Sequence, residues 1–115
     1  MDEAGVKKIL LGFEKKVSKN QEMRIKFPDQ PDKFMVSEME LHDGVRELQN
    51  VSTVPHHYPI MVELNCVSTL LGLLSHENSD IAVAAVDVIQ VNTVFSLVNS
   101  LNTVYSLVNI LNTVF

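Results

Sequence analysis

Four histidines and one cysteine are the side chains of this sequence that most readily bind metals or act as nucleophiles. They are His42, His56, His57, His76 and Cys66. Zinc sites on helices use histidines four residues apart, and no two of these histidines have that spacing. The adjacent pair would point to opposite sides of an extended backbone. We therefore predict surface histidines around a turn and no metal site.

Motifs for catalysis and cofactor binding are missing from the sequence. It has no Gly-x-Ser-x-Gly, P-loop or dinucleotide-binding pattern. Cys66 lies in a leucine-rich segment without a basic neighbour that would favour the thiolate, so we expect a small buried hydrophobic side chain. The sequence thus predicts no catalytic residue, no cofactor and no enzymatic activity. With one cysteine and no secretory leader pattern at the N-terminus, a reducing compartment is expected.

Charge divides the chain into three sections. Residues 1–33 contain eight basic and six acidic residues, whereas residues 34–87 contain one basic and eight acidic residues. Residues 88–115 carry no charge at all. An acidic section attracts basic partners, although such a charge density is also found on ordinary solvated helices. Its candidate surface for binding a basic peptide consists of Glu38, Glu40, Asp43, Glu47, Glu63 and Asp87.

Nucleic-acid binding is not expected from the basic section. Its lysines are interleaved with acidic residues and lack the aromatic side chains on which bases stack. The net charge of −5 also repels phosphate. We interpret the following residues as a solvated helix face: Lys7, Lys8, Lys15, Lys16 and Lys19.

The elements that position these side chains are predicted to be helices. Apolar residues at three- and four-residue steps indicate an amphipathic helix from Asp2 to about Phe27, because Pro28 disfavours helix in the residue before it. A second helix is expected over residues 32–51. Its buried side is predicted to contain Met35, Met39, Val45 and Leu48.

Two further helices are expected after a break at residues 54–59. The third has Pro59 in its first turn and a single apolar stripe through Ile60, Leu64, Val67, Leu71 and Leu74. A short connection follows, and one of residues 78–80 caps the fourth helix. The two helices should form an antiparallel hairpin. The fourth helix is expected to bury Ile81, Ala84, Ala85, Val88 and Ile89.

The C-terminal segment is a tandem repeat with a period of ten residues, beginning at Asn92, Asn102 and Asn112. Its composition leaves four states open: an apolar helix, an aggregation-prone β segment, a membrane span or disorder. The spacing of its apolar residues favours a helix, and recurring polar residues disfavour a membrane span. We expect the tail to fold back onto the fourth helix through Leu97, Val98, Leu101 and Val104. Self-association through this apolar tail is a further expectation.

Two levels of resemblance to known proteins are visible. Residues 63–81, with the alanine-rich residues 82–89, resemble an armadillo repeat: a leucine-rich helix, a polar turn and a small-residue helix. Residues 6–16, 19–29 and 70–74 resemble the beta-catenin-like family. The most specific segment is Arg-Ile-Lys-Phe-Pro-Asp at residues 24–29, since helical periodicity does not demand it. The similarity covers residues 6 to about 90, after which the tandem repeat begins.

The resemblance implies an all-α, armadillo-like right-handed solenoid fragment with a helical or poorly ordered tail. It also implies a nuclear protein associated with pre-mRNA splicing that binds basic peptides of the nuclear-localisation type; no targeting segment is evident in this chain. We divide the chain into a helical cap (1–54), an armadillo-like hairpin (55–91) and the repeat tail (92–115). Two alternatives are a truncated or degenerate product without independent function and a tail-anchored membrane protein.

Overall fold

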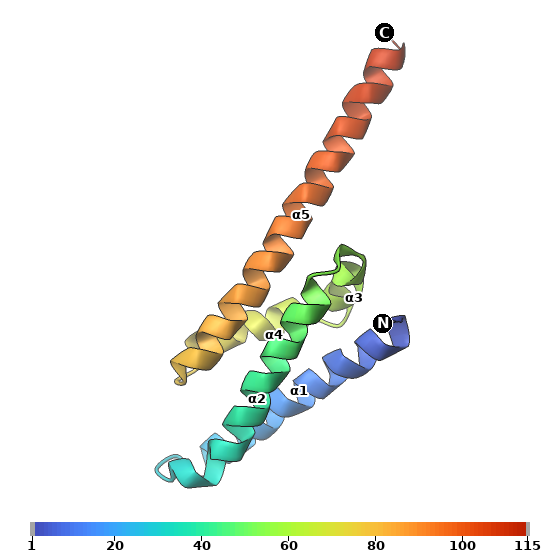
Figure 1. Cartoon of the computed structure of the whole chain (residues 1–115). Coiled ribbons are helices and arrows are strands. Elements are labelled where there is room, and N and C mark those ends of the chain that lie inside the picture. Colours follow the sequence, from blue (N-terminus) through green and yellow to red (C-terminus); the bar gives the residue numbers. More distant parts are fainter. Residues whose placement is uncertain (1, 115) are drawn as a thin grey trace.

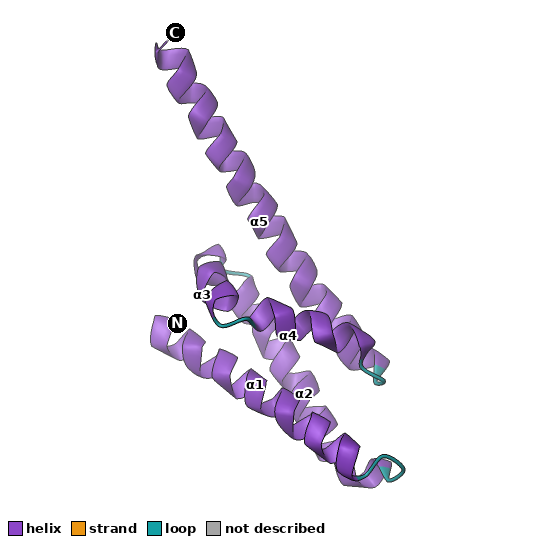
Figure 2. Ribbon diagram, turned by 180° about the vertical axis from the view of Figure 1, so that it is seen from behind, coloured by secondary structure: helices purple, strands orange, loops and turns teal. Residues whose placement is uncertain are grey.

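The computed structural model describes residues 2–114, with all side chains in this range except those of Pro55, Tyr58, Val62, Phe95, Ser96, Asn99 and Val114. Helices account for nearly all of the described backbone, and this part of the chain contains no strand (Figures 1 and 2). The all-α prediction is confirmed. The elements, in chain order, are α1 (Glu3–Lys26), α2 (Pro31–Ser52), η1 (Pro55–His57), α3 (Tyr58–Glu63), α4 (Cys66–Gly72), η2 (Leu73–Ser75) and α5 (Ser79–Val114).

Local sequence signals account for the ends of α1. The Asp2 carboxylate accepts a hydrogen bond of 2.8 Å from the Gly5 amide, which satisfies one of the free N–H groups of the first turn. The helix ends at Lys26, and the Phe27 amide still donates to the Met23 carbonyl. Pro28 follows directly, so the predicted end of this helix is confirmed.

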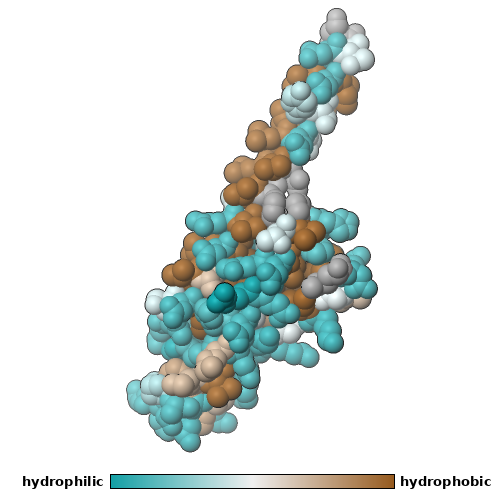
Figure 3. All heavy atoms as spheres, viewed as in Figure 1, coloured by the Kyte–Doolittle hydropathy of each residue, from teal (hydrophilic) through white to brown (hydrophobic). Residues whose placement is uncertain are grey.

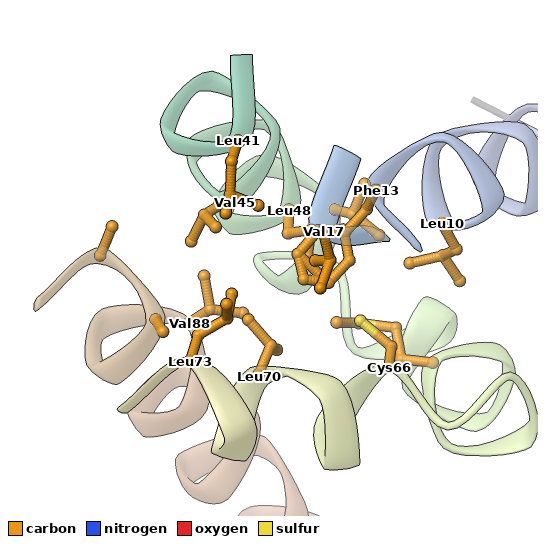
Figure 4. Packing of buried hydrophobic residues seen from close by; sticks show 14 of the residues in the cluster. Leu10, Phe13, Val17, Leu41, Val45, Leu48, Cys66, Leu70, Leu73 and Val88 are labelled. Atoms are coloured by element: carbon orange, nitrogen blue, oxygen red, sulfur yellow. The ribbon is translucent and has the colours of Figure 1, made fainter. Parts of the chain in front are cut away.

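The hydrophobic core lies between α1, α2, α4 and the first part of α5. Phe13 of α1, Leu41 of α2, Leu70 of α4 and Val88 of α5 are buried and face a common centre (Figure 4). Cys66 belongs to the same cluster, which confirms its predicted role as a small buried side chain. Burial, together with the nearby charge of Glu14, raises the pKa of its thiol to about 12, so the thiolate nucleophile is suppressed.

Helix α2 buries a different stripe from the one predicted. Val45 and Leu48 are buried as expected, but Met35 and Met39 are 56% and 62% exposed. The side of the helix facing the core instead contains Phe34 and Leu41. The prediction was wrong for the two methionines because apolar residues lie on more than one side of this helix, and periodicity alone does not choose between the sides.

The predicted third helix is two helices, because Asn65 adopts a left-handed conformation with φ 58° between α3 and α4. Asparagine tolerates this conformation better than most residues. The break redirects the chain, so that Cys66 and Leu70 point into the core while Leu71 and Leu74 are exposed. A single apolar stripe through residues 60–74 is therefore wrong. Pro59 lies in the first turn of α3, as expected.

Helix α5 is a single helix of 36 residues that leaves the body of the molecule (Figure 1). Asn78 caps it, since its side-chain oxygen accepts from the Asp80 amide at 3.0 Å. The five residues of this helix that were expected to be buried do pack in the core: Ile81, Ala84, Ala85, Val88 and, partly buried, Ile89. Among the described side chains, Asn92 is the last buried one, and every described side chain from Thr93 onward is exposed.

The prediction that the tail folds back is wrong. Leu97, Val98, Leu101 and Val104 are 45–68% exposed, and α5 runs without a break through the boundary predicted between residues 91 and 92. Residues 79–114 contain neither glycine nor proline, so nothing in the sequence ends the helix and reverses the chain. Phe115, the end of the third repeat copy, lies outside the described residues. Among the described helices, none is both long and apolar enough to span a membrane.

Candidate functional site

A partly buried ion pair joins α1 to α2. The guanidinium of Arg24 donates from Nε to Glu38 Oε2 at 2.9 Å and from Nη2 to Glu38 Oε1 at 2.6 Å. The same guanidinium lies 4.4 Å from the ring centroid of Phe34. Its third nitrogen, Nη1, donates to Glu77 at 2.8 Å. One arginine therefore connects α1 and α2 to the turn before α5.

Amide and imidazole groups complete this network. Asn20 donates from Nδ2 to Ser37 Oγ at 3.0 Å and to Glu38. Its Oδ1 lies 2.7 Å from His76 Nε2, while His76 Nδ1 accepts from the Asn78 amide at 3.0 Å. Because Nδ1 accepts, the proton of the neutral ring belongs on Nε2, from which it is donated to Asn20.

Burial and hydrogen bonding determine the charges in the network. Burial opposes ionisation of Glu38, but donors from Arg24, Asn20 and Asn78 outweigh it and hold the pKa of this carboxyl below its ordinary value. Burial lowers the pKa of His76, with Arg24 adding to the effect and Glu38 opposing it. The hydrogen bond and charge of Glu38 raise the pKa of Arg24 despite partial burial. At neutral pH the network thus contains an ionised pair and a neutral imidazole.

Two sequence predictions are corrected by this geometry. Glu38 is only 7% exposed and is paired with Arg24, so its carboxylate is not free, although the residue also lines a cavity between α2 and the start of α5. The histidines are not all at the surface: His57 is buried with Nδ1 3.2 Å from the Val51 carbonyl, and His76 has a largely buried side chain. The unusual segment at residues 24–29 was the available signal, because it contains the arginine that organises the network. Within the described part of the chain, no three metal-binding side chains converge.

A groove lies between α2 and α5. One cavity of about 440 Å³ is lined by Phe34, Met35, Met39, Asp43 and Asp80, among others. A second, of about 390 Å³, is lined by Arg46, Val83, Asp80 and Asp87. Because His42 and Asp80 line both cavities, the two adjoin and form one groove, which we call the α2/α5 groove.

The structure distributes the predicted acidic residues over several places. Asp43 and Asp87 line the α2/α5 groove, where Asp80 joins them. Glu40 and Glu47 are exposed on α2 outside the groove, with Glu47 Oε2 4.0 Å from Lys16 Nζ of α1. Glu63 is exposed on α3. Asp80 was not among the acidic residues predicted for this surface, because residues 78–80 were expected to supply a helix cap.

Comparison with known proteins places this architecture in a family. A family model described as catenin-beta-like, Arm-motif containing nuclear, matches residues 1–113. The chain belongs to this catenin-beta-like family. Beta-catenin-like protein 1 of Homo sapiens and that of Bos taurus are each 54% identical to it over 90 residues, which cover 78% of this chain and 16% of the relative. The Schizosaccharomyces pombe homolog is 37% identical over 84 residues, covering 73% of this chain and 15% of the relative.

Family membership confirms the resemblance and the armadillo-like, all-α character of the catenin-beta-like chain. The family is nuclear and Arm-motif containing, so nuclear localisation follows from membership. Arm-motif proteins of this beta-catenin-like kind are generally non-enzymatic scaffolds for protein interaction. The match spans about 16% of the length of these curated relatives.

Proposed function

We propose that this chain is a non-enzymatic segment of a nuclear interaction scaffold and that the α2/α5 groove binds a basic peptide of a splicing-associated partner. The observation that supports this is the set of three carboxylates along one groove: Asp43, Asp80 and Asp87. In the described part of the chain none of the three takes part in an ion pair, unlike Glu38 and Glu47. Their charges are free to attract a cationic ligand.

The apolar lining of the groove supports a peptide rather than a single cation. Phe34, Met35 and Met39 surround the larger cavity, and both methionines are exposed. Methionine side chains adapt to ligands of different shape, and apolar contact supplies affinity that surface charge alone does not. A suitable peptide ligand therefore contains Lys or Arg residues whose charged groups reach the carboxylates. Their aliphatic stems, or neighbouring apolar side chains, contact the methionines.

Fluorescence anisotropy with a labelled Lys/Arg-rich peptide tests this proposal. The groove variant is Asp43→Asn with Asp87→Asn, and the matched control is Glu40→Gln with Glu63→Gln, which removes the same charge outside the groove. We expect the groove variant to bind about tenfold more weakly, equivalent to about 1.4 kcal/mol, and the control to change by less than about twofold. Added salt should weaken binding to the unmodified chain.

Two outcomes would contradict the proposal. Equal losses of peptide affinity in both variants would indicate a general charge effect rather than binding in the groove. Unchanged affinity in both would show that these acidic residues do not contribute to peptide binding. The association with splicing is tested separately in nuclear extract. The control variant should co-precipitate with splicing factors to the same extent as the unmodified chain, and the groove variant should not.

A further inference from the structure

The part of α5 beyond Asn92 exposes large apolar side chains to solvent. Figure 1 shows it extending past the other helices, and Figure 3 shows apolar residues along it. Leu101 and Tyr105 are 68% and 69% exposed. An apolar surface of this extent on a soluble protein usually marks a site of association.

Six of these residues follow the spacing of a coiled coil. Steps of three and four residues alternate without interruption through Val94, Leu97, Leu101, Val104, Val108 and Leu111, all of which are exposed. We call this set the heptad stripe. In a two-stranded coiled coil, side chains with this spacing insert between those of the facing helix.

The ten-residue repeat produces this seven-residue pattern because of its paired apolar residues. Three steps of 3.5 residues need about 10.5 residues, half a residue more than the repeat supplies. Each of the first two copies contains an adjacent Leu-Val pair, at residues 97–98 and 107–108. The stripe contains the first residue of the first pair, Leu97, and the second residue of the second pair, Val108. This shift by one residue compensates for the difference between the ten-residue repeat and the coiled-coil spacing.

From Leu97 onward, the heptad stripe lies on the side of α5 that faces away from the body. Nine residues correspond to about two and a half helical turns, so residues nine apart lie on opposite sides. Ala85, Val88 and Asn92 are buried against the body. Val94, Leu97 and Leu101 follow them by nine residues each and are exposed. Val94, at the start of the stripe, still lines a cavity of about 360 Å³ with Thr53 of the body. From Leu97 onward, a second helix can pack along the stripe without meeting the body of its own chain.

We propose that the heptad stripe pairs with the same stripe of a second copy of this chain to form a two-stranded coiled coil. Residues 88–115 contain no charged residue, so two copies approach without repulsion between like charges, whereas a charged partner would have to desolvate its charges against valine and leucine. The stripe spans about 26 Å from its first to its last residue. An interface of this size is at the small end for stable complexes, so the dimer should depend on concentration.

Sedimentation equilibrium of the full chain, from about 1 µM to about 100 µM, tests the proposal. The stripe variant is Leu101→Glu with Val108→Glu. The matched control, Asn102→Glu with Asn109→Glu, adds the same charges one residue further along, outside the stripe. We expect a monomer–dimer equilibrium for the unmodified chain and the control. The stripe variant should remain monomeric, at least tenfold weaker in self-association, with unchanged melting of the body by circular dichroism.

A charge-complementation experiment separates specific pairing from aggregation and does not depend on one variant. The stripe variant mixed with Leu101→Lys/Val108→Lys should form a heterodimer, although neither dimerises alone. A monomeric unmodified chain throughout this range, or a stripe variant that still dimerises, would overturn the proposal. So would polydisperse oligomers unaffected by the stripe substitutions, or flotation of the unmodified chain with phosphatidylcholine vesicles in place of dimerisation.

Discussion

Polar side chains form different hydrogen bonds in the body of the molecule, up to Asn92, and in the part of α5 that protrudes beyond it. In the body, polar side chains connect distant parts of the chain: Arg24 contacts Glu38, 14 residues away, and Asn20 contacts His76, 56 residues away. In the protruding part, the hydroxyls of Thr93 and Thr113 donate to carbonyls four residues earlier in the same helix, both at 2.8 Å. The body is fixed by tertiary contacts, whereas the protruding segment is held by contacts within its own helix.

This difference shows what tertiary packing adds to helix formation. Most helices in proteins gain their stability from burying an apolar face, and an isolated helix is marginal in water. The first part of α5 buries Ile81, Ala85 and Val88, but the continuation of the same helix buries none of its described side chains after Asn92. The same type of substitution should therefore have different effects in the two regions.

The largest expected effect comes from one change made in both regions. Leu41→Ala removes a fully buried side chain from the core and should reduce the free energy of unfolding by about 3 kcal/mol, because a cavity remains. Leu101→Ala, measured by urea denaturation at a concentration where the chain is monomeric, should change it by less than about 0.5 kcal/mol. Similar losses at the two sites would mean that the protruding segment packs against the body in solution.

Removal of Arg24 should have the next largest effect. Arg24→Met leaves the Glu38 carboxylate buried without its main partner and should cost about 2 to 3 kcal/mol by urea denaturation, somewhat less than a fully buried pair because the arginine is partly exposed. As a control, Lys7→Met removes the exposed contact of 3.4 Å with Glu3 and should cost less than about 0.5 kcal/mol. If both variants lose equally little, the network does not stabilise the body.

A smaller effect is expected from acid. The native pKa values of His76 and Glu38 lie below their ordinary values of 6.5 and 4.5, so in both cases the unfolded chain takes up protons that the folded chain does not. Stability should fall with decreasing pH, first below about 6.5 through His76 and then below about 4.5 through Glu38. Urea denaturation at pH 7, 5.5 and 4 measures this, and His76→Gln should remove the first step only. The protruding segment has no acidic or basic residue and should keep its helicity.

Features determined by neighbouring residues could be predicted from the sequence. The end of α1 before Pro28 and a helix cap within residues 78–80 depend on residues within a few positions, and both predictions were confirmed, with Asn78 as the cap. The burial of Glu38 could not be predicted, since a carboxylate in a helix reads as exposed until a buried partner from another helix is known. The break at Asn65 was missed because asparagine is compatible with a helix as well as with a left-handed turn.

The acidic charge of the candidate site could be predicted from the sequence, but the positions of the carboxylates relative to one another could not. The acidic section predicted carboxylates without showing that Asp43, Asp80 and Asp87 line one groove between two helices. The direction of the repeat segment could not be predicted from its apolar pattern either. Its apolar residues predicted a helix correctly, but their periodicity does not state whether that helix finds a partner within its own chain.

The protruding part of α5 also governs how the molecule moves through solution. The radius of gyration of the Cα atoms of the whole molecule is 17.8 Å, with principal extents of 68 × 27 × 17 Å, whereas a compact chain of this length has a radius of about 13 Å. An elongated particle has more friction than a sphere of equal mass. In gel filtration a monomer of this chain should elute early and imitate a larger species, so its mass has to come from light scattering or sedimentation equilibrium rather than from elution volume.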